Sequence, residues 1–396
     1  MKFLDQMDIK GKKLLIRVDY NVPLKDGVIQ DDNRIRGSIP TLTYALENEA
    51  AIIVSSHLGR PKGKRMPELS LSPTAKRLSE LLQHEVQMAH DCIGPEVTRL
   101  AEALKPGQVL MLENLRFHEQ EEKNDPIFSK QLAELADVYV DDAFAVAHRA
   151  HASVVGVTEY AKACCGGFLV KKEWEYLGEA LADPKSPYVA IFGGAKVSSK
   201  LGILNQLLDK ADAMIIGGTM ANVFLLAQGN TVGKSLVENG LVGEVQNILD
   251  KAEKKGVKLH LPVDFVLGES MNSKASAGTC DAENIPDDLM VLDVGPKSVA
   301  LFEEVLKPVK TVMWNGPMGA FENPAFANGS MSLAKTIANL DNALTICGGG
   351  DTDVVIHKAG LTNKFSFIST GGGSFMAFLE GKELPAFKAL KKCDRK

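Results

Sequence analysis

One order of segments recurs in the second half of this chain: a short apolar run, then glycines, then a segment with helical periodicity. It occurs four times, at Tyr188 to Leu208, Ala213 to Gly229, Thr345 to Gly360 and Phe365 to Gly381. Strand-length apolar runs that alternate with helices are typical of parallel strands joined by crossovers. The pattern therefore predicts a parallel sheet that is covered by helices on both faces.

The first half of the chain alternates in a similar way. Apolar runs predict strands at 14–18, 52–54, 109–112 and 138–140, and Lys25-Asp26-Gly27-Val28 predicts a hairpin turn between the first strand and a neighbour. Between the halves, Gly167 to Pro187 places apolar residues on one helical face before two prolines end it. We predict an α/β chain with two doubly wound, Rossmann-like parallel-sheet domains, at 1–168 and 187–373, joined by a helix at 169–186 with a cleft between them.

The composition limits the function classes. With 396 residues, of which 45% are hydrophobic and 24% charged, the chain has the composition of a globular protein and a length that favours two or three domains. Its net charge of -5 offers no bulk attraction to nucleic acid or to an anionic membrane. The N-terminus has no signal-peptide pattern, no apolar run is long enough to cross a bilayer, and the six cysteines have no metal spacing. We expect a cytoplasmic protein with reduced cysteines and no nucleic-acid or membrane partner.

Two glycine triplets, Gly348-Gly349-Gly350 and Gly371-Gly372-Gly373, each stand between an apolar run and a helical segment. Such turns let backbone amides approach a phosphate, although glycines also serve in tight turns that bind nothing. Asp351 and Thr352 follow the first triplet, and an acid with a hydroxyl beside phosphate amides suits a magnesium nucleotide. Neither triplet completes a dinucleotide fingerprint, and GNTVGKS at 229–235 has the wrong spacing for a P-loop.

Cationic side chains follow the predicted strands of the first half. Because ligands of parallel sheets bind beyond the carboxyl ends of strands, these positions are candidate binding residues. The polar and charged residues found there are Asp19, Asn21, Arg34, His57, Arg60, Asn114, Arg116, His148, Arg149 and His151. Four arginines among them predict a pocket for a small, multiply charged acid. A metal site at His148 and His151 is the alternative, but no carboxylate or cysteine stands at a supporting spacing.

Eight segments of the chain together carry a family resemblance: RVDYNVP (17–23), SSHLGRP (55–61), ENLRFHEQE (113–121), DAFAVAHRAHAS (142–153), GGAKVSSK (193–200), WNGPMGAFE (314–322), GGGDT (348–352) and STGGGS (369–374). Through these segments the chain resembles the phosphoglycerate kinase family along nearly its whole length. The resemblance implies reversible, magnesium-dependent transfer of a phosphoryl group between ATP and the carboxylate of 3-phosphoglycerate, with ADP and 1,3-bisphosphoglycerate as products. It also implies a hinge-bending monomer whose C-terminal segment, about 374–396, packs on the first domain.

The resemblance further implies a role for each matching residue. The implied 3-phosphoglycerate site is Asp19, Asn21, Arg34, His57, Arg60, Arg116 and Arg149. The implied nucleotide site is Lys196, Gly217, Asn315, Glu322, Gly348, Gly349, Gly350, Asp351 and Thr352, with Asp351 also serving the magnesium ion. Arg34, Lys200, Gly371 and Gly372 are the implied catalytic residues, with Gly373 beside them.

The chain departs from the family pattern at four positions. Ala145 and Val146 replace a Gly-Thr pair near the acid site, Thr219 replaces a glycine near the adenine site, and Ser199 replaces an aspartate.

The implied chemistry needs no general base, because a carboxylate nucleophile with a pKa of roughly 4 is already ionised. A different class remains open, namely a non-catalytic anion- or nucleotide-binding protein on the same fold.

Overall fold

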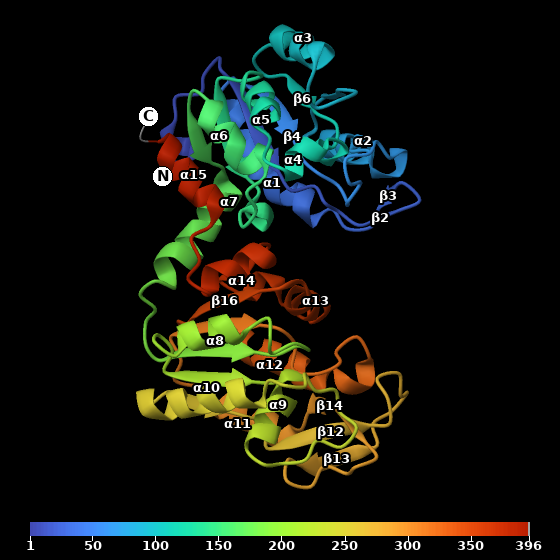
Figure 1. Cartoon of the computed structure of the whole chain (residues 1–396), viewed down its shortest axis with the longest axis vertical. Coiled ribbons are helices and arrows are strands. Elements are labelled where there is room, and N and C mark those ends of the chain that lie inside the picture. The colour runs from blue at the N-terminus through green and yellow to red at the C-terminus, as the bar shows by residue number, and fades with distance from the viewer. Residues whose placement is uncertain (395–396) are drawn as a thin grey trace. The chain divides into compact units, whose positions relative to one another are not determined.

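The computed structural model describes residues 1–394. Two compact units form within the chain (Figure 1). Unit 1 comprises Met1–Glu175 together with the C-terminal residues from Lys382, and unit 2 comprises Tyr176–Gly381. None of the helices in the described residues is both long enough and apolar enough to span a membrane.

Unit 1 is built on a six-stranded parallel sheet with the strand order β5-β6-β4-β1-β7-β8. Its strands are β1 (Lys13–Val18), β4 (Ala51–Ser55), β5 (Val86–Met88), β6 (Val109–Met111), β7 (Val138–Asp142) and β8 (Cys164–Gly166). Its helices are α1 (Asn33–Glu47), α2 (Ser72–Leu82), α3 (Pro95–Ala103), α4 (Glu119–Glu122), α5 (Pro126–Ala133), α6 (Val157–Tyr160), α7 (Phe168–Glu173) and α15 (Pro385–Cys393). The four strands predicted for the first half are thus confirmed.

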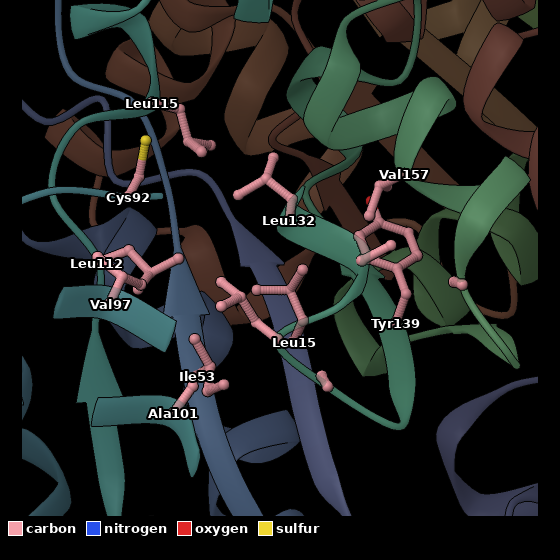
Figure 2. Close-up of a cluster of buried hydrophobic side chains, with 14 of the residues drawn as sticks. Leu15, Ile53, Cys92, Val97, Ala101, Leu112, Leu115, Leu132, Tyr139 and Val157 are labelled. Carbon is pink, nitrogen blue, oxygen red and sulfur yellow. The ribbon is translucent and has the colours of Figure 1, made fainter. Parts of the chain in front are cut away.

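Both faces of this sheet are buried, as the apolar runs require. Leu15 points into a cluster with side chains of α3, α5 and α6, and Figure 2 shows it near Leu132 and Tyr139. Its neighbours Leu14 and Ile16 point to the opposite face, into a cluster with α1 and α2. Alternation along one strand therefore supplies two cores, which fixes the register of the sheet.

The predicted hairpin forms, but its strands differ from the expectation. Lys25 to Val28 connects β2 (Leu24–Lys25) and β3 (Val28–Ile29), which make their own two-stranded antiparallel sheet. The first strand, β1, pairs only with β4 and β7 among the described residues. Two parallel neighbours already occupy both of its edges, so the hairpin cannot join it.

Unit 2 has a parallel sheet in the order β11-β10-β9-β15-β16-β17. Its strands are β9 (Tyr188–Phe192), β10 (Ala213–Ile216), β11 (Lys258–His260), β15 (Thr311–Asn315), β16 (Leu344–Gly348) and β17 (Phe367–Ser369). Its helices are α8 (Leu201–Leu207), α9 (Met220–Ala227), α10 (Val242–Lys255), α11 (Pro296–Leu306), α12 (Asn328–Ala338), α13 (Gly350–Lys358) and α14 (Gly373–Leu379). The chain runs outward in both directions from the neighbouring pair β9 and β15, which makes that pair the topological switch point.

Unit 2 also contains a small antiparallel sheet that the sequence pattern did not predict. It has the order β13-β12-β14, with β12 at Asp264–Gly268, β13 at Gly278–Asp281 and β14 at Met290–Val294. Its buried side chains pack with Leu225 of α9 in a separate apolar cluster. The doubly wound sheet is therefore extended on one side by a second layer of strands.

The helix predicted between the two halves is present as α7 followed by a π-helical segment, η6 (Trp174–Ala180). Val170 and Leu177 are buried, as their shared helical face predicts. The division between the two units falls inside this helical run, after Glu175.

The prediction that all six cysteines are reduced is wrong for two of them. Cys164 and Cys393 form a disulfide, whereas Cys92, Cys165, Cys280 and Cys347 are free. The bond joins the first residue of β8 to the last residue of α15 across 229 positions of sequence. A pairing this distant depends on where α15 packs, so the spacing of the cysteines could not reveal it.

Candidate active site

The first set of predicted residues gathers where the strands of unit 1 end. Asp19 follows β1, His57 follows β4, Arg116 follows β6 and Arg149 follows β7. Arg34, in the first turn of α1, forms an ion pair through Nη1 with Asp19 Oδ2. Nearby, Asn21 Oδ1 accepts a hydrogen bond of 2.9 Å from the Gly59 amide. The structure thus connects the loop after β1 both to α1 and to the loop after β4.

His57 lies at the centre of the cationic side chains. Its side chain is buried, and its Nδ1 lies 3.1 Å from Arg17 Nη2. A guanidinium group only donates, so Nδ1 accepts and any ring proton resides on Nε2. Burial holds the pKa of His57 well below its usual value, and the charges of Arg17, Arg116, Arg34 and Arg149 lower it further. His57 is therefore neutral, and four arginines act on this one ring.

Arg116 is a buried cation whose guanidinium is only partly satisfied. Nη1 donates to the Gly59 carbonyl at 2.8 Å, and Nε lies 3.5 Å from Glu122 Oε1. Burial and the neighbouring arginines lower its pKa to about 10. Nε and Nη2 of Arg116, and Nε of Arg149, are buried without a hydrogen-bond partner in the structure. Since buried N–H groups are normally paired, these donors suit an anionic ligand.

Arg60 stands apart from the other predicted arginines. Its side chain is exposed, and it is not among the arginines that act on His57. The structure therefore brings together Asp19, Asn21, Arg34, His57, Arg116 and Arg149, and Arg60 lies outside the set of arginines that act on His57.

Among the residues that the structure describes, neither His148 nor His151 belongs to a group with potential metal-ligand geometry. Burial and the nearby arginines lower the pKa of His151 to about 3, and its Nδ1 lies 3.8 Å from Glu121 Oε1. Within residues 1–394, the one group with potential metal-ligand geometry is Asp91, Cys92 and His118. There His118 Nε2 is already hydrogen bonded to Asp91 Oδ1 at 2.6 Å, and burial raises the pKa of the Cys92 thiol well above its usual value.

Two buried charged residues beneath the arginines were missed by sequence reasoning. Arg17 is fully buried in β1 and donates through Nε to Ser153 Oγ at 3.2 Å. Glu121 is also fully buried and accepts hydrogen bonds from the amide and hydroxyl of Ser153, at 2.9 and 2.6 Å. Arg17 interrupts the apolar run KLLIRV, and a charge inside a buried strand is the signal that could have identified it.

Glu121 is expected to stabilise unit 1 through this network. Replacing it with alanine removes the acceptor for two Ser153 donors and a buried carboxylate whose ionised form is favoured by the charge of Arg17. We expect Glu121→Ala to lower the free energy of unfolding by about 3 kcal/mol. Urea unfolding measures this, with the exposed Glu119→Ala in the same short helix α4 as control. Equal stability of the two variants would contradict the assigned role.

In unit 2 the glycine turns follow neighbouring strands at the switch point. Gly193 and Gly194 follow β9, Gly316 follows β15, and Gly349 follows β16. Gly349 precedes α13 with φ +103°, a conformation that disfavours side chains, and an added Cβ would lie 2.8 Å from Asn315 Nδ2. Asn315 Nδ2 in turn donates to the Gly348 carbonyl at 2.7 Å. Gly349 therefore needs to be glycine for backbone reasons, and the triplet places the start of α13 at the strand ends.

Lys200 is the buried cation of unit 2. Its Nζ donates to the Gly193 carbonyl at 2.5 Å and to the Asn315 carbonyl at 3.1 Å. Burial lowers the pKa of Lys200 to about 8, while the charge of Asp351 acts in the opposite direction. The ammonium group thus lies between the β9 and β15 turns and within electrostatic reach of Asp351.

The remaining residues near the triplet differ in exposure. Asp351 is exposed in the first turn of α13, whereas Thr352 is buried and its Oγ1 accepts from the Gly316 amide at 2.7 Å. Lys196 is exposed on the loop after β9. Thr352 therefore supports the turn after β15, while Asp351 and Lys196 face solvent.

A cavity of about 120 Å³ adjoins these turns. Its lining includes Gly194, Thr219, Phe321, Glu322 and Asp351, with apolar residues of the antiparallel sheet. Gly217 lies next to it in a space where an added Cβ would come within 2.3 Å of Met318 Sδ. Thr219, which replaces a glycine of the family pattern, thus places a side chain on the cavity wall. The cavity combines an apolar slot with carboxylates at its edge, which suits a base and sugar.

The second triplet lies beyond the next strand, β17. The amide of Gly371 donates to Ser369 Oγ at 3.1 Å, and Gly372, with φ +46°, precedes α14. Since β17 pairs in parallel with β16, this turn and the first triplet both lie at the carboxyl ends of neighbouring strands.

Comparisons with known proteins agree with this arrangement. The family model for phosphoglycerate kinase matches residues 4–382. Among curated relatives, the phosphoglycerate kinase of Maridesulfovibrio salexigens is 61% identical over 99% of both chains, and that of Geobacter sp. strain M21 is 51% identical over 99% of this chain and 98% of its own. The solved phosphoglycerate kinase of Coxiella burnetii has a TM-score of 0.91 at 41% identity over 98% of both chains. That of Pyrococcus horikoshii has a TM-score of 0.87 at 32% identity over the full length of both. With the fold, the strand-end residues and these matches in agreement, the chain belongs to the phosphoglycerate kinase family.

Proposed function

We propose that this protein transfers a phosphoryl group reversibly between ATP and the carboxylate of 3-phosphoglycerate. The observation that carries the proposal is the convergence of four arginines on the neutral His57, with buried guanidinium N–H groups of Arg116 and Arg149 that have no hydrogen-bond partner in the structure. Such a group binds a compact, multiply charged anion, and 3-phosphoglycerate carries a phosphate and a carboxylate. Arg60, Arg116 and Arg149 hold the distant phosphate, while Asp19, Asn21 and His57 orient the rest of the acid.

The nucleotide binds to unit 2 in this proposal. Its base and ribose occupy the cavity beside Thr219 and Glu322, and its phosphates meet Lys196 and the turns at Gly348 to Thr352. A magnesium ion fits here, because Asp351 offers an exposed carboxylate at the start of α13 and Mg²⁺ usually takes few protein ligands besides phosphates and water. Asp351 would hold the ion, which supplies neutralisation of phosphate charge.

The reaction then needs alignment and charge rather than a base. The acid's carboxylate is ionised at neutral pH and attacks the terminal phosphorus directly. Arg34 and Lys200 neutralise the equatorial oxygens of the migrating group, and the Gly371-Gly372 turn lets it pass close to the backbone. Because the acid site and the nucleotide site belong to different units in this proposal, transfer requires domain closure. The proposed hinges are the two ends of the helix at 167–187 and the turn at 369–373.

Arg116→Ala is expected to raise KM for 3-phosphoglycerate by roughly 10- to 100-fold with kcat changed by less than about threefold. A clamp on a phosphate that does not react binds the ground state and the transition state alike. Steady-state kinetics with each substrate varied in turn measures this, and KM for ATP should stay constant. An unchanged KM with a strongly reduced kcat would contradict this role and would indicate that Arg116 stabilises the transition state.

A coupled assay of ADP formation tests the function directly. ADP should form from Mg-ATP only when 3-phosphoglycerate is present, and trapping the product with hydroxylamine should reveal an acyl phosphate. Binding of ATP and of the acid without turnover would favour the non-catalytic binding protein instead. We further propose that the protein works as a cytoplasmic monomer without nucleic-acid or membrane partners, which sedimentation of the purified chain would test for its oligomeric state.

A further inference from the structure

A second cavity, of about 200 Å³, lies in unit 1. One wall comes from α6 and the π-helical segment η5 (Ala152–Gly156), and the other comes from α15. The lining includes Glu159, Lys388, Lys392 and Cys393. Figure 1 shows α15 beside α6, consistent with their packing. None of these residues belongs to the proposed phosphoryl-transfer machinery.

Cys393 connects this cavity to the disulfide. Of the two bonded cysteines, both in the described part of the chain, Cys393 lines the cavity and Cys164 does not. Cys164 begins β8, which pairs with β7 at the edge of the sheet, and both cysteines belong to the core cluster of that face. Because Cys393 lines the cavity and Cys164 does not, Cys393 is the residue of the pair that a reagent in the cavity contacts.

Non-covalent contacts hold α15 on unit 1 independently of the disulfide. The ring of Phe387 packs on Phe144 and on Trp174, with centroid distances of 5.9 and 5.3 Å. At the end of the helix, Asp394 pairs with Lys2 Nζ at 3.0 Å and with the N-terminal ammonium at 3.6 Å. The disulfide can therefore open while α15 stays docked.

The charge around the cavity favours an anion. The lining contains two lysines, Lys388 and Lys392, and one carboxylate, Glu159, whose Oε1 lies 3.6 Å from Lys392 Nζ. Lys388 Nζ also pairs with the Glu383 carboxylate, outside the lining, at 3.3 Å. Local positive charge raises the concentration of anionic reagents and lowers that of cationic ones.

We propose that Cys393 is a site of thiol–disulfide exchange with a small thiol that carries carboxylate groups. The thiolate of this ligand attacks Cys393 Sγ, the bond to Cys164 breaks, and Cys164 leaves as a thiolate that takes a proton from water. The product is a mixed disulfide on Cys393. A second molecule of the thiol then attacks the ligand's sulfur, which releases the oxidised form of the ligand and leaves both cysteines reduced. The Cys164–Cys393 bond closes a covalent loop that contains all of unit 2, and this exchange opens that loop.

Reduced glutathione is the probe that tests the site. The full-length protein is purified without reductant, exposed to glutathione, alkylated and examined by fragmenting mass spectrometry. Four of the six cysteines should be alkylated after denaturation before exposure, in line with the free thiols of the structure. After exposure, the glutathione adduct should be on Cys393 and a new alkylated thiol on Cys164.

Charge reversal tests whether the cavity is the route. Lys388→Glu with Lys392→Glu should slow the reaction with glutathione at least about threefold at low salt and should speed the reaction with cysteamine, a cationic thiol. Lys76→Glu, an exposed lysine on α2, is the matched control and should change neither rate. Because each thiol is compared with itself across the variants, the difference in intrinsic reactivity between glutathione and cysteamine does not affect the result.

Three results would overturn the proposal. Six free thiols in the unreduced protein would show that the disulfide is not formed. An adduct on Cys164 would show that the thiol attacks the other sulfur. Equal rates for the charge-reversed and control variants would show that the thiol does not enter through the cavity. Should the charge-reversed variant fold poorly, Cys164→Ser offers a second test. Its unpaired Cys393 should take one glutathione from oxidised glutathione, and an unreactive Cys393 would contradict the proposal.

Discussion

Arg34→Ala is expected to lower kcat by roughly a thousandfold, with little change in the free energy of unfolding. The guanidinium pairs with Asp19 at the strand-end cluster, yet about 40% of the side chain is exposed and available to a ligand. An arginine that neutralises a migrating phosphoryl group contributes factors of this size in other phosphoryl-transfer enzymes. Steady-state kcat with both substrates saturating is the measurement.

The same helix supplies a matched control for Arg34. Arg36 lies two residues further along α1, also pairs with an aspartate, Asp32, and is more exposed. Arg36→Ala should therefore keep kcat within about twofold, and Arg34→Lys should fall between wild type and alanine because it keeps the charge without the planar fork. If Arg34→Ala retained more than a tenth of the activity, Arg34 would not be a residue that neutralises the migrating phosphoryl group in the transition state.

Lys200→Met is expected to lower kcat by roughly a hundredfold or more. Methionine fills a similar volume, so the packing between the β9 and β15 turns is largely kept while the charge is lost. Removing one preorganised donor to a developing charge typically costs a factor of this size. Thermal unfolding of the variant gives the cost of leaving the Gly193 and Asn315 carbonyls without their donor, and kcat gives the catalytic effect.

The pH profile supplies an independent test of Lys200. Burial lowers its pKa to about 8, so the ammonium form is present below that pH and is lost as the pH rises through it. We expect kcat/KM for ATP, which reports the free enzyme, to fall on the alkaline side with an apparent pKa of about 8. Lys200→Arg should move this limb to higher pH because a guanidinium keeps its proton. A wild-type profile that stays flat to pH 10 would contradict the assignment.

The strands were predictable because parallel strands buried on both faces leave continuous apolar runs. The runs at 14–18, 52–54, 109–112 and 138–140 all correspond to strands, and the glycine triplets lie between strands and helices as expected. Local pattern was sufficient there, because burial on both faces leaves a continuous apolar run in the strand's own sequence and because the backbone freedom of glycine is a property of the residue itself.

Local pattern failed wherever distant segments decide the outcome. Arg17 lies inside an apolar run, and its guanidinium donates hydrogen bonds to His57 and Ser153, which are 40 and 136 positions away in the sequence. The Cys164–Cys393 bond depends on the packing of α15, and the β2–β3 hairpin depends on both edges of β1 being occupied. The roles given to individual site residues, and the functional division between the two units, stay predictions that the variants above address.

The central claim is that the acid binds to unit 1 and the nucleotide to unit 2, and hydrogen exchange with one ligand at a time tests it most directly. 3-Phosphoglycerate alone should slow exchange in the loops at 56–60 and 114–117, and ADP alone should slow it at 193–200 and 348–352. Protection of one and the same unit by both ligands would contradict the account.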